Sequence, residues 1–267
     1  RPTYLSRTTL KSIATLFSLI GTWCTPVNSM FAMPLGVHKF VVSQASMLPG
    51  VPAEIGAYVG DPLQVPPYFK DTICQGTYDE DANRDPRADP DNIFTWIGLF
   101  NWGSHFWNPD GGPSGGRLDR VGEILVNLDQ QNAYQRGRVL YDRATSMYTE
   151  NPAAAYYLLG KVAHLIADCA TPAHVHLDPH ITDQTRFGDD SLEEYLEARY
   201  GETMWGRFAF AWDFPVSGLS PLDYSELPDG GYEQEPPLFM IFLSMALTAQ
   251  SYDSDDADGI LDQGSRR

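Results

Sequence analysis

Three observations predict that this chain folds into an all-α structure. Its 267 residues are 43% hydrophobic, which is enough for a proper core. Apolar residues recur at helical spacing in several runs, and long segments rich in proline, glycine and aspartate separate these runs. Alternating apolar and polar stretches, which are typical of strands, are scarce. We therefore expect one helical domain over residues 33–250, preceded by a targeting segment and followed by an acidic tail.

The targeting segment is expected to be a secretory signal peptide over residues 1–32. It has three basic residues near its start, Arg1, Arg7 and Lys11. An apolar stretch follows over residues 13–24, and small and polar residues then extend to Ala32. The apolar stretch is too short to span a bilayer comfortably. A buried N-terminal helix is the alternative. A signal peptide predicts a secreted or periplasmic protein whose mature chain begins at Met33.

The first half of the domain should contain two helices separated by loops. Residues 37–48 are expected to form a helix that a Pro-Gly pair closes. Residues 82–92 and 108–117 are rich in proline, glycine and aspartate and are predicted to be loops. Residues 131–149 place apolar side chains on one face and polar ones on the other, which predicts an amphipathic helix.

The best-defined helix of the sequence begins after Asn151. Asparagine is a good N-cap, and Pro152 suits the first helical position. The helix should end near Ala170, before Pro172.

Two further helices are expected towards the C-terminus. One starts near Asp190 or Ser191, where a capping signal precedes the sequence LEEYLEARY. A loop rich in proline and glycine covers residues 214–237, and the apolar run over residues 238–249 predicts a final buried helix.

The chain is strongly acidic, with 18 Lys+Arg against 35 Asp+Glu and a formal net charge of −17. Residues 1–32 hold three basic and no acidic residues, so the mature chain would have 15 Lys+Arg against 35 Asp+Glu, a charge of −20. Such a surface repels polyanions and suits several bound divalent cations, so we expect no stable nucleic-acid partner. Cys74 and Cys169 remain after processing, and a bridge between them is left open.

The histidines gather around one helical pair. His164 and Asp168 are four residues apart in the best-defined helix, so both side chains leave the same face and could hold one metal ion. A buried histidine hydrogen-bonded to aspartate is the alternative. His174 follows at the spacing His-x3-Asp-x5-His, while His38 and His105 each lie in a short distinctive context.

The sequence SHFWNPD at residues 104–110, together with the downstream block from His164 to His174, resembles the zinc-dependent phospholipase C family of bacteria. That family is related in fold to the S1/P1 nucleases. The resemblance extends from about Met33 to Tyr200. It implies a helical domain built around a cluster of two or three zinc ions.

The resemblance implies a first zinc held by an aspartate from a loop, the histidine of the SHF motif and the helical pair. In this chain those ligands are Asp81, His105, His164 and Asp168. Asp81 is placed by the spacing Gly76-x4-Asp81, which is similar to the family's Gly-x4-Asp. Its neighbours Asp79 and Glu80 are alternatives, and an acidic run of this kind is usually a solvated loop.

Two more zinc sites are implied. The second would use the backbone amine and carbonyl of Met33, the side chain of His38 and the shared Asp168, although the family has tryptophan at the mature terminus.

The third would use His174 with Asp190 and Glu194, where the family has a His-x3-Glu pair. Helix capping is the alternative role for both acidic residues. His176 or His180 could complete the third site instead.

The implied activity is phospholipase C, with phospholipid or another phosphodiester as substrate and transient contact with a membrane surface. Asp81 would act as ligand and general base. Trp102 matches an aromatic position that contacts choline in the family. The aromatic residues Phe106, Trp107 and Tyr78 could instead belong to the core. We expect a monomer.

Two other functions stay open at this point. One is a zinc nuclease of the S1/P1 branch, and the other is a non-catalytic binding protein that metal stabilises.

The acidic tail covers residues 251–267. Its segment Asp256-x-Asp258-Gly259-x-x-Asp262 resembles the calcium loops of thrombospondin type 3 repeats, which implies Ca²⁺ as a second kind of cofactor. A solvated acidic tail is the alternative.

Overall fold

The computed structural model describes residues 35–48, 51–61, 72–82, 102–116, 120–121, 124–125, 131–177, 237–255 and 261–262. Over these ranges the fold is all-α, as the sequence predicts. Strand structure there is confined to two short antiparallel ladders. β1 (Arg120–Val121) pairs with β2 (Ile124–Leu125), and β3 (Ser254–Asp255) pairs with β4 (Leu261–Asp262).

The described part of the chain contains α-helices and, between α4 and α5, two short 3-10 helices. Their bounds are α2 Leu35–Ala45, α3 Ala53–Val59, α4 Ile73–Ala82, η1 Trp102–His105, η2 Pro109–Ser114, α5 Ala133–Met147, α6 Pro152–Asp168, α7 Pro172–His176 and α9 Pro237–Ala249. Among the described helices, none has both the length and the apolar character that crossing a membrane requires.

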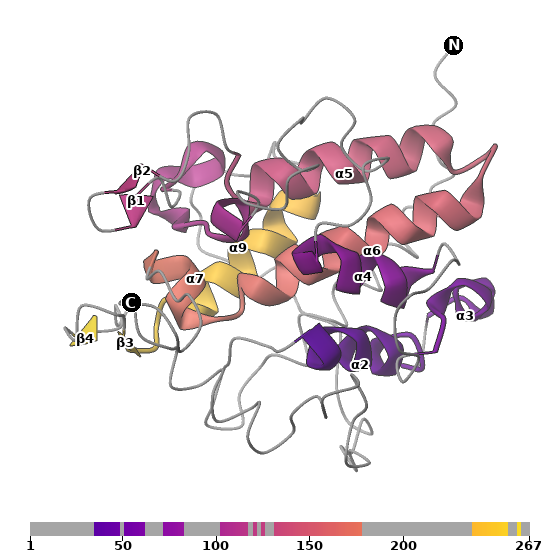
Figure 1. The fold of residues 1–267 in the computed structure, drawn as a ribbon, viewed down its shortest axis with the longest axis horizontal. Coiled ribbons are helices and arrows are strands. Elements are labelled where there is room, and N and C mark those ends of the chain that lie inside the picture. The colour runs from indigo at the N-terminus through magenta and orange to yellow at the C-terminus, as the bar shows by residue number, and fades with distance from the viewer. Residues whose placement is uncertain are drawn as a thin grey trace.

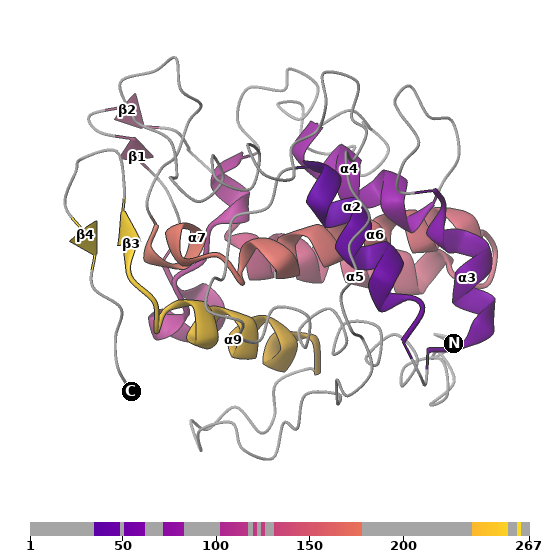
Figure 2. The same ribbon diagram turned by 90° about the horizontal axis from the view of Figure 1, so that it is seen from below.

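Helix α6 lies at the centre of the helical layer and packs against α4 and α5 (Figures 1 and 2). Its side chains are buried from Ala155 to Asp168, so the helix is enclosed on all sides. The Asn151 side chain caps it by accepting a hydrogen bond of 3.2 Å from the backbone N–H of Ala154. Pro152 occupies the first turn, as predicted. The helix ends at Asp168, and Pro172 then starts α7.

Helices α4 and α6 approach each other at backbone contact. A Cβ added at Gly76 would lie 1.8 Å from the carbonyl oxygen of Tyr157, and one at Gly160 would lie 2.1 Å from that of Ile73. Thr77 joins the two helices, because its hydroxyl donates to Gly160 O at 3.0 Å and to Ile73 O at 2.9 Å. This close crossing brings the polar side chains of α4 directly against α6.

The other side of the core is aromatic. Trp107 packs against the rings of Tyr134 on α5 and of Phe239 and Phe242 on α9. Helix α5 begins with a capping box in which Asn132 and Gln135 bond each other's backbone N–H groups at 2.8 and 3.1 Å.

The three aromatic side chains for which a core role was the alternative are all buried. They are Tyr78, Phe106 and Trp107.

Several predicted boundaries shift by a few residues. The helix expected at 37–48 spans Leu35–Ala45, the one at 131–149 spans Ala133–Met147, and the last one begins at Pro237. The helix predicted to end near Ala170 ends at Asp168. The predicted loop at 108–117 contains η2, which Asn108 caps by accepting from the N–H of Asp110 at 3.0 Å.

The sequence interpretation missed helices α3, α4 and α7. Helix α4 is the instructive case, because its polar sequence ICQGTYDEDA has a glycine in the middle and acidic residues at its end. Those features favour a loop in isolation, but here the glycine permits the crossing with α6 and residues 73–80 are buried.

Other predictions concern residues outside the described ranges. They are the signal peptide at 1–32, the helix beginning near Asp190, and most of the loops predicted at 82–92 and 214–237 and of the proposed calcium loop. Cys74 and Cys169 are described, and both are buried free thiols, so no bridge joins them in this structure.

Candidate metal centre

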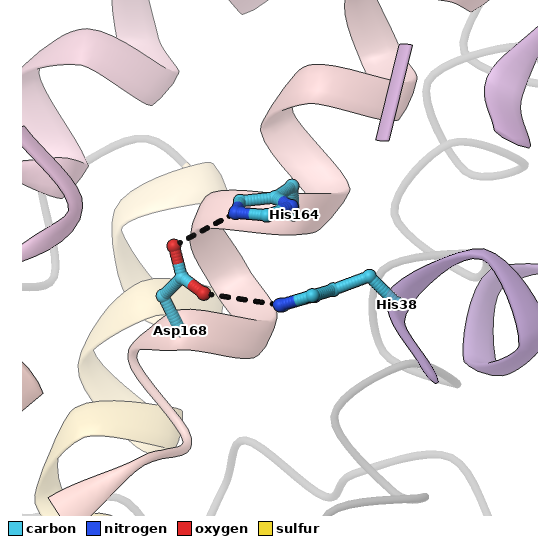
Figure 3. Close-up of side chains that lie close together, drawn as sticks. All are labelled: His38, His164 and Asp168. Atoms are coloured by element: carbon cyan, nitrogen blue, oxygen red, sulfur yellow. Dashed lines mark ion pairs between the residues drawn. The ribbon is translucent and has the colours of Figure 1, made fainter. Parts of the chain in front are cut away.

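The two oxygens of the Asp168 carboxylate contact different histidines. Its Oδ1 is 3.3 Å from Nε2 of His38. Its Oδ2 is 2.7 Å from Nδ1 of His105 and 3.2 Å from Nε2 of His164. Figure 3 shows that His38 and His164 each point to a different oxygen of the carboxylate, His164 from the same helix and His38 from another. One carboxylate therefore serves two groups of nitrogen donors.

Separate elements bring these side chains together. Helix α6 supplies His164 and Asp168 one turn apart, α2 supplies His38, and η1 ends at His105. The rings of His38 and His164 stack with centroids 3.9 Å apart, and His105 meets His164 edge-on at 5.0 Å. All four residues are at most 4% exposed, so their side chains are buried.

His174 on α7 is connected to the centre through the backbone of His105. Its Nδ1–H donates to the carbonyl oxygen of His105 at 3.0 Å, and its ring stacks on Phe106 at 4.6 Å between centroids. The backbone N–H of Trp107 donates a hydrogen bond of 3.1 Å to the carbonyl oxygen of His174. With the proton on Nδ1, the lone pair of the imidazole is on Nε2, the form in which histidine binds metal.

The neighbouring imidazoles stabilise the ionised form of Asp168. Burial by itself would raise the pKa of this carboxyl. The neighbouring His164, His174 and His105 outweigh burial and hold its pKa well below the usual range. Asp168 is therefore a carboxylate, the ionisation state that a metal ligand needs.

The donor set fits a zinc ion. The ligand atoms of His38, His164 and Asp168 lie within 4.8 Å of one another. Imidazole nitrogen and carboxylate oxygen are both zinc ligands, and tetrahedral bonds of about 2.0–2.1 Å place neighbouring ligand atoms about 3.3 Å apart. The contact of His38 with Oδ1 of Asp168 and that of His164 with Oδ2 both have nearly this length, at 3.3 and 3.2 Å, so each histidine could share an ion with the oxygen that it faces. The shorter contact from His105 is a hydrogen bond donated to the carboxylate.

The remaining predicted ligands are only partly visible. Asp81 belongs to the last turn of α4, so the expectation that it comes from a loop is wrong. Its side chain lies outside the described part of the chain, as does that of Trp102 in η1. Met33, Asp190 and Glu194 also fall outside the described ranges, so their roles stay predictions.

The acidic neighbours of Asp81 are not a solvated loop, which corrects the alternative offered for them. Glu80 is completely buried and forms ion pairs with Nε of Arg136 and with Nζ of Lys161, the latter at 3.0 Å. Asp79 accepts a hydrogen bond of 3.1 Å from the hydroxyl of Tyr157. Both carboxylates already have protein partners, so neither is a good substitute for Asp81 as a metal ligand.

The ion pairs also govern the charge of Glu80. Burial would raise its pKa, but Arg136 and Lys161 lower it well below the usual range, so Glu80 is ionised.

The sequence interpretation did not single out Arg136 or Lys161. A signal was present for Lys161, because it is a lone basic residue in an apolar helix and lies three positions before His164, on the same face.

His176 was an alternative ligand for the third zinc. Its Nε2–H donates to the carbonyl oxygen of Tyr252 at 2.9 Å, so this ring nitrogen connects α7 to the segment before β3. His180 lies outside the described ranges.

Comparison with known proteins found no relative: no family model, no curated protein and no solved structure matches the chain.

Proposed function

We propose that this chain is an exported zinc-dependent phosphodiesterase, a phospholipase C that hydrolyses phospholipid to diacylglycerol and a phosphorylated headgroup. The observation that carries the proposal is the position of Asp168, whose Oδ1 faces His38 and whose Oδ2 faces His105 and His164. A carboxylate shared between two nitrogen sets suits two adjacent zinc ions, and neighbouring zinc ions are suited to phosphodiester cleavage.

The contacts around Asp168 support His38, His105, His164 and Asp168 as ligands, and the other ligands are proposed from the motifs alone. His105, His164, Asp168 and Asp81 would hold the first zinc. His38, Asp168 and the backbone of Met33 would hold the second. His174, Asp190 and Glu194 would hold the third. Bound zinc would supply Lewis-acid polarisation of a phosphoryl oxygen and lower the pKa of a water molecule.

The other steps are assigned to side chains of the chain itself. Asp81 would accept the proton of the attacking water, because a carboxylate next to that water can act as general base. The bond to the backbone carbonyl of His105 orients the His174 imidazole, and the bond to Asp168 orients the His105 imidazole. The buried position of Asp168 and its three histidine neighbours keeps competing water away from the ligand atoms.

The acidic composition favours a lipid over a nucleic acid as substrate. A chain with 18 basic and 35 acidic residues repels a polyanion along its length, whereas a single phosphodiester in a lipid headgroup presents one charge. Trp102 is assigned to contact with a cationic headgroup, and the contact with the membrane surface would be transient. The active form would be a monomer.

The test is phosphocholine release from phosphatidylcholine vesicles by the mature protein. Release that a chelator abolishes and added zinc restores would support the proposal. A protein that retains zinc yet releases no phosphocholine would reject choline lipids as substrates. Single-stranded DNA tested in parallel distinguishes the remaining functions, because cleavage would indicate a nuclease, and inertness towards both substrates would indicate a binding protein.

A further inference from the structure

A buried triad of charges lies next to the candidate metal centre. Glu80 of α4 is 0% exposed, Arg136 of α5 is 5% exposed and Lys161 of α6 is 1% exposed. The Glu80 carboxylate binds Arg136 through one oxygen and Lys161 through the other, at 3.0 Å for the lysine. One carboxylate thus joins three helices and faces two cations.

The triad is adjacent to the centre along two of these helices. Lys161 precedes His164 by three residues on α6, so both lie on one face of that helix. Glu80 immediately precedes Asp81 on α4. The carboxylate of Glu80 also interacts electrostatically with His105, which contacts Asp168 directly. A change of charge in the triad therefore changes the electrostatic potential at the histidines around Asp168.

Stability is a weak explanation for the triad. A buried ion pair costs much of its attraction in lost hydration, and apolar replacements of similar volume are often as stable. Helices α4 and α6 are already held at backbone contact through Gly76, Gly160 and Thr77. Three buried charges at this position have a clearer use as a source of electric field.

We propose that Glu80, Arg136 and Lys161 set the zinc affinity of the histidine–aspartate centre through their charge. The proposal rests on the proposed function, because it requires that the centre bind zinc. The triad carries a net charge of +1, since one carboxylate faces two cations. Lys161 and Arg136 repel a divalent cation at the centre, and Glu80 offsets part of that repulsion. The buried position reduces screening by solvent and salt.

Four variants separate charge from packing. Glu80→Gln raises the triad to +2, Lys161→Met and Arg136→Met each lower it to 0, and the double variant Glu80→Gln with Lys161→Met restores +1. Arg138→Met is the matched control, because it removes the same charge from an exposed position on the same helix.

The experiment is zinc titration of the metal-free mature protein against a competing chromogenic chelator. We expect Glu80→Gln to weaken zinc binding about tenfold or more, and Lys161→Met and Arg136→Met to strengthen it by a similar factor. The double variant should return close to the parent, and Arg138→Met should change affinity by less than about twofold.

Opposite effects of Glu80→Gln and Lys161→Met are the signature of the electrostatic role. Equal weakening by both variants, or no change in either, would overturn the inference and leave the proposed function in place. A parent protein that binds no zinc would overturn both. Circular dichroism of each metal-free variant checks folding, and if Glu80→Gln does not fold, the gain in affinity expected for Lys161→Met still decides the matter.

Discussion

His38 Nε2 lies 3.3 Å from Oδ1 of Asp168, although the two residues are far apart in the sequence. His38 belongs to α2, and Asp168 is the last residue of α6. His164 approaches the other oxygen of the same carboxylate at 3.2 Å. Asp168 is thus the connection between the ligand sets, and its removal should affect both.

Replacing Asp168 with asparagine should remove bound zinc and reduce phosphodiesterase activity by about a thousandfold or more. The asparagine amide is neutral and has a single oxygen, whereas the aspartate carboxylate has two oxygens that contact different histidines. Asp142→Asn on the exposed face of α5 is the control and should retain both properties. Zinc content by mass spectrometry gives the readout, and an unchanged content in Asp168→Asn would contradict the site assignment.

Replacing His164 with alanine should abolish zinc binding, whereas His176→Ala should keep it. His164 is 0% exposed and its Nε2 lies 3.2 Å from Asp168. His176 is half-buried and its Nε2–H bonds the carbonyl of Tyr252. The measurements are zinc stoichiometry and vesicle hydrolysis for both variants. Equal loss of zinc and of hydrolysis in the two variants would contradict the assignment of His164, and not His176, as a zinc ligand.

An extra residue before Met33 should weaken one zinc, because the mature terminal amine is expected to be a ligand. Extension moves that amine away from the site and replaces it with an amide nitrogen, which is a poor donor. The same residue added after Arg267 serves as the control. We would measure zinc stoichiometry and hydrolysis rate, and an unchanged count and rate in the N-terminal extension would exclude the terminal amine as a ligand.

Replacing Gly160 with alanine should destabilise the fold by about 1–3 kcal/mol or more, because the new methyl group would lie 2.1 Å from the carbonyl oxygen of Ile73. Gly56→Ala is the opposite case. It lies in α3 with nothing within 4 Å of the added Cβ, so it should stabilise by about 0.5–1 kcal/mol. Denaturant unfolding measures both, and a stable Gly160→Ala would show that α4 and α6 do not touch here.

The thiols of Cys74 and Cys169 should resist alkylation in the native state at pH 9. Burial raises the pKa of Cys74 from 9.0 to about 12, and burial with the nearby Asp168 raises that of Cys169. A raised pKa keeps the group as an unreactive thiol at a pH where an ordinary cysteine is half ionised. A thiol reagent should therefore leave Cys74 and Cys169 unmodified before unfolding and modify both after it. A missing pair of thiols after unfolding without reductant would indicate a disulfide.

Much of the centre could be predicted from local sequence. The spacing of His164 and Asp168 within a well-capped helix required that they share a face, because helical geometry repeats every 3.6 residues. The SHF motif and the early histidine marked His105 and His38 by their resemblance to a family. The structure brings all of these together around one carboxylate.

The burial of the acidic residues in α4 could not be predicted from local sequence. Glu80 looks like a solvent-exposed charge in sequence, and its burial depends on Arg136 and Lys161, which come from two other helices. No local pattern encodes those partners.

The sequence by itself therefore determined the helical class, the caps of α6 and the faces on which its ligands lie, because these depend on residues within a few positions of one another. The tertiary structure alone decided that α4 is a helix, that Glu80 is buried among cations and that the oxygens of Asp168 are divided between histidines of different elements. The physical reason is that burial of charge is tolerated only where distant parts of the chain supply the opposite charge or a hydrogen bond.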